Sequence, residues 1–242
     1  MPPPKPKRSF WQKLDPFTYV DDYVVPILNP WNNSIFNWII YLLFSFFFAF
    51  AIYSIIGFLL QTATPLVIVV SGSMLPSMAR GDVVVLQGIS GVTVNAPLVV
   101  LDTVDVRQTS LEDLADFERV AGGDWKLTFK ANNQTILVPS RGDTDILVYV
   151  SDHRGLEIIH RAIVKIKSGD DYFFLTKGDN NPSLDQDCGK VESIPIPGTA
   201  IPQIVTQKPC PSPYPIPEDK VNGKALFWIP YVGYVKLLLF DQ

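Results

Sequence analysis

The most prominent feature of the hydrophobic pattern is an apolar run from Trp38 to Leu60 that contains no charged residue. About 20 consecutive apolar residues span the hydrocarbon core of a bilayer as a helix. A cleavable signal peptide would begin nearer the N-terminus and have an apolar core of about 7–15 residues. A buried helix of a soluble protein is the remaining alternative. The length of the run predicts a transmembrane helix over residues 35–60.

Positive charges flank this helix on one side. Residues 61–79, which follow it, contain no Lys or Arg. Because Lys and Arg favour the cytoplasmic side, we expect residues 1–34 to form a cytoplasmic and interfacial segment and residues 61–242 to lie outside. The membrane would be the cell membrane or, in a eukaryote, that of the endoplasmic reticulum. The basic residues that precede the helix are Lys5, Lys7, Arg8 and Lys13.

After the helix the pattern becomes that of β-strands, with short β-branched or alternating segments between Gly, Asn and Pro turns. One segment, 110–120, instead predicts a soluble helix, because Ser110 can serve as N-cap with Asp113 three residues later. The chain after the membrane helix is therefore expected to be mostly β. The predicted strands are 66–70, 83–86, 97–106, 125–129, 135–138, 146–150, 157–167 and 172–176.

The strand predicted at 157–167 alternates regularly and carries a histidine. Side chains two residues apart in a strand share a face. His160 should thus lie on the more apolar face, and Lys165 and Lys167 on the opposite one. The residues expected beside His160 are Ile158, Ala162, Val164 and Ile166.

Composition excludes several classes of protein. Charged residues make up 18% of the chain, below the roughly 25% of soluble domains, which agrees with a membrane protein. A balance of 20 basic against 24 acidic residues argues against nucleic-acid binding. With only 2 His and 2 Cys, the chain can form neither a multi-histidine metal centre nor a disulfide-rich scaffold. We expect no metal and no cofactor.

Ser71-Gly72-Ser73 follows directly after the predicted strand 66–70. A serine nucleophile needs a rigid mount, an exposed hydroxyl and donors for the oxyanion, which a strand ending in a glycine turn can supply. The alternative is an ordinary polar turn. The position of this segment just after the membrane helix favours Ser73 as a nucleophile.

His160 is the candidate general base, because imidazole titrates near neutral pH and can accept a serine proton. The alternative is a structural histidine that donates to a backbone carbonyl. A base of this kind needs a carboxylate to orient it. Asp179 and Asp185 follow the next strand and are candidates, although Asp in such turns often caps backbone amides. His153 lies in a loop and has no comparable setting.

Several blocks, in order along the chain, resemble type I signal peptidases of the archaeal and endoplasmic-reticulum (Sec11-like) branch. This branch uses histidine where the bacterial relatives use lysine. The blocks cover most of the chain from Pro65 to Val235. They are LVIVVSGSMLP (66–76), RGD (80–82), IIHR (158–161), LTKGDNNPSLD (175–185) and VNGKALFWIPYVGYV (221–235).

The resemblance implies a membrane-bound serine endopeptidase that removes signal peptides from exported proteins at the outer membrane face. Ser73 matches the nucleophile and His160 the general base. Asp185 matches the triad aspartate and Asp179 the other important acidic position. Ser71 matches the residue that helps the nucleophile's N–H to form the oxyanion hole. The implied partners are signal peptides of preproteins and the lipid bilayer, with an export channel or accessory subunits as further candidates.

The chain also departs from the family. Residues 107–156 are expected to form an inserted α+β subdomain within a β-rich catalytic domain made of 61–106 and 157–242. Residues 188–219 form a second, proline-rich insertion. Cys188 and Cys210 fall in or beside it, and outside the cytoplasm they would form either a disulfide or two free thiols.

Two other functions are consistent with parts of this pattern. One is an inactive, membrane-tethered binding or scaffold module of the same fold. The other is a self-cleaving Ser–Lys peptidase of the repressor type, against which the membrane helix and the predicted facing of Lys165 and Lys167 argue.

Overall fold

The structure is a computed structural model. It describes residues 9–120, 124–139, 142–151, 155–188, 193–195, 202–204 and 210–240. The chain divides into two compact units, Met1–Ile56 and Gly57–Gln242.

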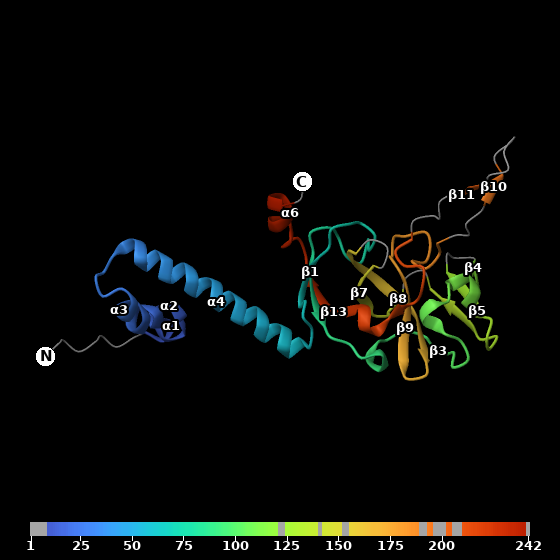
Figure 1. Cartoon of the computed structure of the whole chain (residues 1–242), viewed down its shortest axis with the longest axis horizontal. Helices are drawn as coiled ribbons and strands as arrows, with labels where there is room; N and C mark the ends of the chain where they lie inside the picture. The colour runs from blue at the N-terminus through green and yellow to red at the C-terminus, as the bar shows by residue number, and fades with distance from the viewer. Residues whose placement is uncertain are drawn as a thin grey trace. The chain divides into compact units, whose positions relative to one another are not determined.

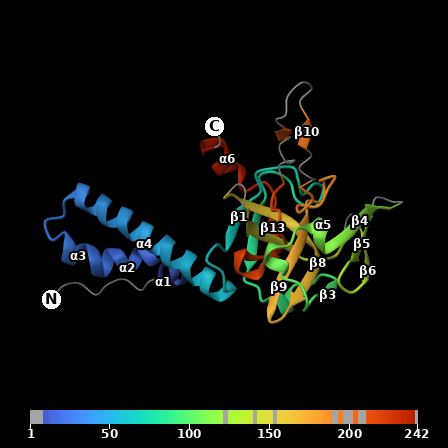
Figure 2. The same ribbon diagram turned by 45° about the vertical axis from the view of Figure 1, so that its right-hand side comes forward.

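The first unit is helical. In Figures 1 and 2 its short helices lie beside the first half of α4, the long helix that continues into the second unit. Phe17 packs edge-on against Phe44 of α4, with ring centroids 5.4 Å apart, and the Tyr41 hydroxyl donates a hydrogen bond to Asp21. The helices are α1 (Phe10–Leu14), α2 (Pro16–Tyr19), the π-helix η1 (Val20–Val24), α3 (Val25–Leu28) and α4 (Ser34–Leu60).

Helix α4 is the predicted membrane helix. Among the described residues it is the one helix long and apolar enough to cross a bilayer, with a mean hydropathy of 2.4 over its most apolar window. Only 6% of that window is buried, whereas a core helix of a soluble protein would be mostly buried. The prediction of one apolar N-terminal helix that could span a membrane is confirmed by length and composition.

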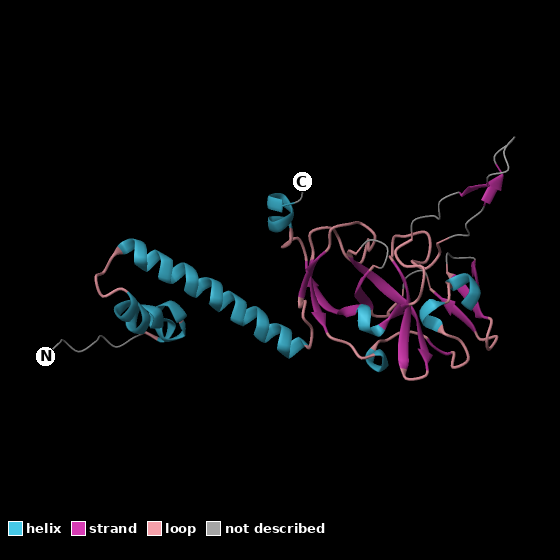
Figure 3. Cartoon of the chain, in the orientation of Figure 1, coloured by secondary structure: helices cyan, strands magenta, loops and turns pink. Residues whose placement is uncertain are grey.

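The second unit is β-rich, as the strands in Figure 3 show. Eight strands of its described part form one sheet in the order β1-β2-β13-β7-β8-β9-β12, with β3 paired to β8 in parallel. The C-terminal strand β13 lies between β2 and β7, and β1 is at an edge. The strands are β1 (Leu66–Ile68), β2 (Val83–Gln87), β3 (Leu98–Val100), β7 (Ile146–Val150), β8 (Glu157–Ser168), β9 (Asp171–Lys177), β12 (Ile216–Pro217) and β13 (Val221–Ile229).

Two smaller sheets and several short helices complete the unit. The strands of the smaller sheets are β4 (Ala115–Arg119), β5 (Trp125–Phe129) and β6 (Thr135–Val138) in one, and β10 (Ser193–Pro195) and β11 (Pro202–Ile204) in the other. The helices are α5 (Leu111–Leu114), α6 (Tyr234–Phe240) and the 3-10 turns η2 (Gly91–Thr93), η3 (Val106–Gln108) and η4 (Glu218–Lys220).

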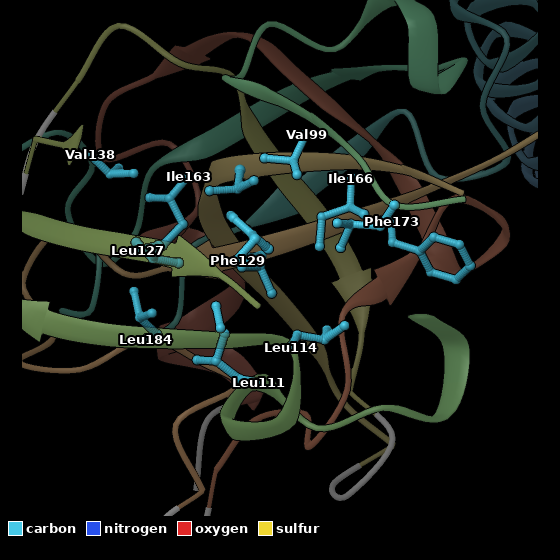
Figure 4. Packing of buried hydrophobic residues seen from close by; sticks show 14 of the residues in the cluster. Val99, Leu111, Leu114, Leu127, Phe129, Val138, Ile163, Ile166, Phe173 and Leu184 are labelled. Atoms are coloured by element: carbon cyan, nitrogen blue, oxygen red, sulfur yellow. The ribbon is translucent and has the colours of Figure 1, made fainter. Parts of the chain in front are cut away.

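The sheet of β4, β5 and β6 shares a hydrophobic core with the main sheet (Figure 4). Leu127 and Phe129 of β5 belong to one buried cluster with Ile163 and Ile166 of β8. Leu184, next to the candidate Asp185, belongs to the same cluster. The inserted strands therefore pack against the segment that carries a candidate site residue.

The sequence predicted most strands correctly, and β5, β6 and β7 match their predicted bounds. The strand expected at 97–106 is reduced to β3, and the other predicted strands differ by at most two residues at an end. Strand β7 falls within the insertion expected at 107–156, and it pairs with β8 and β13 in the main sheet.

The helix predicted at 110–120 is wrong beyond its first turn. Ser110 does cap helix α5 by accepting a hydrogen bond from the Asp113 N–H. From Ala115 the chain is strand β4, paired along its length with β5. Alternate residues Ala115 and Phe117 turn toward the core, so pairing and burial outweigh the weak helical propensity of this segment.

The predicted facing of Lys165 and Lys167 is also wrong. The register between β8 and β9 shifts between Ala162 and Val164, a β-bulge that reverses the alternation beyond Ile163. Lys165 therefore lies on the same face as His160, and Val164 on the opposite one. A period-two pattern cannot reveal an extra residue in a strand.

The C-terminal block 221–235 forms strand β13 and, after a turn, the start of helix α6. The apolar side chains of this tail are largely exposed, among them Trp228, Val235 and Leu238. The tail is held against the turn that precedes β2, because the Gly233 N–H donates to the Gly81 carbonyl at 2.8 Å.

Candidate active site

Ser73 lies in a loop that follows β1 and is anchored by buried side chains. Val69 continues the pairing with the Gly81–Asp82 turn through two backbone hydrogen bonds of 2.8 and 2.9 Å. Met74 and Met78 are buried beneath the loop. Ser73, which directly precedes Met74, remains partly exposed. The loop thus holds Ser73 on a rigid base, as a nucleophile requires.

The turn that contains Asp179 holds this loop from the other side. The backbone N–H of Asn180 donates to the Ser73 carbonyl at 2.8 Å, and its side-chain amide donates to the Gly72 carbonyl at 3.2 Å. A Cβ at Gly178 would lie 2.8 Å from the Ser73 carbonyl oxygen. Only glycine allows the two segments to approach so closely.

Ser71 lies next to the hydroxyl of Ser73. The two Oγ atoms are 3.1 Å apart, and the Ser73 N–H points at Ser71 Oγ from 3.5 Å, a long hydrogen bond. Ser71 is exposed. One O–H and one N–H donor therefore lie beside the candidate nucleophile.

His160 and Asp185 form a buried pair. His160 Nδ1 lies 2.5 Å from Asp185 Oδ2, and the two residues are 4% and 1% exposed. With the proton on Nδ1, the imidazole donates to the carboxylate and keeps Nε2 as an acceptor. The pair has the geometry of a histidine oriented by a carboxylate.

Ser73, His160 and Asp185 line the same cleft, which has a volume of about 490 Å³. No direct hydrogen bond joins Ser73 to His160, both of which lie in the described part of the chain. Hydrogen bonds between catalytic groups are often long without substrate and shorten when it binds. The cleft is otherwise largely apolar, with Val67, Val148, Leu156, Ile158 and Ile159 in its walls.

Asp179 makes a different set of contacts. Arg161 binds its carboxylate with two N–H groups, each at 2.8 Å, and Ser77 Oγ donates to it at 2.5 Å. Burial by itself raises the pKa of Asp179, but the hydrogen bonds from Arg161 and Ser77 and the charges of Arg161 and Lys177 outweigh it, so the net pKa is lowered. Asp179 thereby ties the serine loop to strand β8.

No protein-family model matches this chain, but it is similar along most of its length to known proteins. The signal peptidase complex catalytic subunits (Sec11) of Neurospora crassa and Candida tropicalis are each 24% identical to it over 194 residues. These matches cover 80% of this chain and 74% and 76% of the two relatives. The Schizosaccharomyces pombe protein is 24% identical over 192 residues, covering 78% of this chain and 74% of that protein.

The chain is similar to Sec11-type signal peptidases. The resemblance expected from the sequence blocks is confirmed, since the matched length extends well beyond those blocks.

The lysines near this Sec11-like site are bonded to backbone carbonyls. Lys165 Nζ donates to Val94 at 2.8 Å and to Val92 at 3.3 Å. Burial lowers the pKa of Lys165, Asp145 opposes this shift and Lys224 adds to it. Lys177 Nζ donates to the Gly178 carbonyl at 2.9 Å. Neither lysine lines the cleft that contains Ser73, so the Ser–Lys alternative gains no support.

Cys188 and Cys210 form a disulfide, which decides between the two states left open by the sequence. The disulfide holds residues 210–212 beside the Sec11-like site. The Ser212 N–H lies 3.4 Å from the Asp185 carbonyl, and Pro211 lines the cleft. The proline-rich insertion thus supplies part of the cleft wall.

Sequence reasoning missed several residues around the site. Arg161 and Thr176 lay in recognised blocks but were given no role, although Thr176 is hydrogen-bonded to Asp185. Tyr149, also hydrogen-bonded to Asp185, lay outside the blocks. No sequence signal marks Tyr149, because its partner is distant along the chain. The other histidine, His153, lies outside the described residues. In the part that the structure describes, no three His, Cys, Asp or Glu side chains gather in a metal-binding arrangement.

Proposed function

We propose that this chain is a membrane-bound serine endopeptidase that removes N-terminal signal peptides from exported proteins. The observation that carries the proposal is the shared cleft, in which a rigidly mounted serine and a buried His–Asp pair meet. The relatives are named catalytic subunits, which favours the peptidase over an inactive binding module.

In the proposed mechanism Ser73 Oγ attacks the scissile carbonyl while His160 Nε2 accepts its proton. Asp185 holds the imidazole with Nδ1–H directed at the carboxylate and stabilises the imidazolium that forms. The tetrahedral oxyanion is stabilised by the Ser73 N–H and the Ser71 O–H. Collapse of this intermediate transfers the proton from His160 to the leaving amine. Water then hydrolyses the acyl-enzyme by the same steps.

The cleft suits an extended, largely apolar peptide. Apart from the candidate catalytic groups and from Glu157, Asn181 and Ser183, its walls are apolar. Strand β1, which leads to Ser73, is an edge strand of the described sheet. An extended substrate can pair with such an edge through main-chain hydrogen bonds. Specificity would then come from the side-chain pockets of the cleft.

We further propose that helix α4 anchors the enzyme with its N-terminus in the cytoplasm and the catalytic domain on the outer face. The basic residues before the helix support this orientation. The exposed apolar tail at Trp228, Val235 and Leu238 would face the bilayer surface. The relatives are subunits of a signal peptidase complex, so accessory subunits are proposed partners.

The test is cleavage of a preprotein by the purified full-length chain in detergent or liposomes. Ser73→Ala and His160→Ala should each lower kcat by at least about 1000-fold, since triad members act as a unit. The double variant should be little worse than either single one. His153→Ala serves as the matched control and should change kcat less than about twofold. Cleavage by Ser73→Ala at the wild-type rate would refute the proposal. So would a wild-type chain that cleaves no preprotein, either alone or with co-purified partner subunits.

A further inference from the structure

The carboxylate oxygen of Asp185 that meets His160 accepts two further hydrogen bonds. Tyr149 Oη donates to it at 3.0 Å and Thr176 Oγ1 donates to it at 2.7 Å. The Tyr149 and Thr176 side chains are completely buried. Asp185 Oδ2 is therefore held by an imidazole, a phenol and an alcohol away from water.

The strand register explains why these two hydroxyls converge on Asp185. Strand β8, which carries His160, lies between β7 and β9. Tyr149 of β7 pairs with Ile158, and Thr176 of β9 pairs with Ala162. Both partners lie two residues from His160, one on each side, and share its face. The two donors thus approach Asp185 from the strands that flank the histidine.

The backbone around Asp185 is attached to the same residue of β9. The Asp185 N–H donates to the Thr176 carbonyl at 2.9 Å. The Thr176 N–H in turn donates to Gln186 Oε1 at 3.0 Å, and Gln186 is 2% exposed. Thr176 therefore fixes both the main chain and the carboxylate of Asp185.

Tyr149 remains a proton donor in this setting. Burial raises the pKa of Tyr149 well above its ordinary value, and the charge of Asp185 raises it further. The phenol therefore keeps the proton that it donates. Hydrogen bonds to an ionised group are stronger than those between neutral groups.

We propose that Tyr149 and Thr176 are positioning residues that fix the carboxylate of Asp185 and thereby hold His160 in the tautomer with its proton on Nδ1. Their kinetic effect rests on the proposed peptidase function. Without them Asp185 Oδ2 would retain only the imidazole, and its carboxylate could rotate away from Nδ1. Substrate binding should be unaffected, because neither residue lines the cleft.

The kinetic test compares variants that remove one hydroxyl and conserve volume, in the full-length chain with a preprotein substrate. Tyr149→Phe and Thr176→Val should each lower kcat about tenfold, the size expected from one hydrogen bond to a charged group, with KM changed less than about twofold. Thr176→Ser keeps the hydroxyl and should retain most of the wild-type kcat. Tyr172, on strand β9, contacts Lys165 through its ring. Tyr172→Phe is the matched control and should leave kcat unchanged.

The second readout does not depend on activity. In a His153→Gln background His160 is the only histidine of the chain, so ¹⁵N-histidine NMR reports which imidazole nitrogen carries the proton. Wild type should show Nδ1–H, and Tyr149→Phe and Thr176→Val should show a mixture of tautomers. An unchanged tautomer in both variants would overturn the inference, even if kcat fell, because the defect would then lie elsewhere. If the wild type cleaves no preprotein, the proposed function fails and the NMR comparison alone decides this inference.

Discussion

The two buried carboxylates of the site belong to one short loop but occupy different surroundings. Asp179 is bound by the Arg161 guanidinium and Ser77, whereas Asp185 is bound by an imidazole and two neutral hydroxyls. A carboxylate whose charge is balanced by Arg can hold segments together. A carboxylate whose partners are neutral keeps its charge available for an imidazolium. The difference supports the proposed role of Asp185 as the partner of His160, and we propose a structural role for Asp179.

The largest effect that separates the two is expected from Asp185→Asn. Loss of the charge and of the acceptor for Nδ1–H should lower kcat by about 10⁴-fold. The melting temperature of the full chain in detergent should change little, because size and packing are conserved. Preprotein cleavage and thermal unfolding measure the two quantities. A large loss of stability with a small loss of kcat would exchange the roles assigned to Asp185 and Asp179.

The next effect is expected from Asp179→Asn, which leaves the partly buried Arg161 without its charge partner. Breaking a fully buried ion pair costs about 3–5 kcal/mol, so this partly exposed pair should lose somewhat less, and activity should fall because the serine loop loses its tie to β8. Denaturant unfolding in a fixed detergent measures the loss. The matched control replaces both partners, Arg161→Met with Asp179→Leu, and should cost less than the single change. Equal or greater loss in the double variant would contradict the pairing.

The disulfide should stabilise the segment around Ser212 that is hydrogen-bonded to the Asp185 backbone. Its cysteines are 22 residues apart, and closing a loop of this length stabilises the folded state by about 3 kcal/mol. Cys188→Ser with Cys210→Ser should lose about this much and lower kcat through the segment bonded to Asp185. Unfolding with and without reductant checks the stability. If reduction changed neither stability nor kcat, the disulfide would have no part in holding the site.

The smallest effect concerns pH. The pKa of Asp179 is lowered in the folded protein, so the folded state binds this proton less readily than the unfolded state. The stability that results is complete above the ordinary carboxyl pKa of about 3.9 and is lost as pH falls through the lower, folded-state value. Between neutral pH and pH 3, the unfolding free energy of wild type should therefore decline more steeply than that of Asp179→Asn. Parallel curves would show that Arg161 does not stabilise this carboxylate.

Local patterns in the sequence were sufficient for most of the elements and for naming the candidate residues. An apolar run as long as α4 has few alternatives. Strand β5 has a period-two pattern that pairing reinforces, and β7 is a short apolar run between turns. The serine, the histidine and both aspartates could be named because they fall in short contiguous blocks. Helix α5 was overestimated because a cap and a weak helical pattern are local signals, whereas strand β4 depends on its pairing with β5.

Tertiary structure decided what no local pattern encodes. The bulge at Ile163 changes which side chains share the face of His160, because pairing across strands fixes where the extra residue lies. The hydroxyls of Tyr149 and Thr176 reach Asp185 only because β7 and β9 flank β8. The sequence by itself was enough to name the candidate groups for the proposed chemistry. Which of these groups lie in contact, and whether their partners are charged or neutral, depended on burial and strand register. These bring together residues that are distant along the chain.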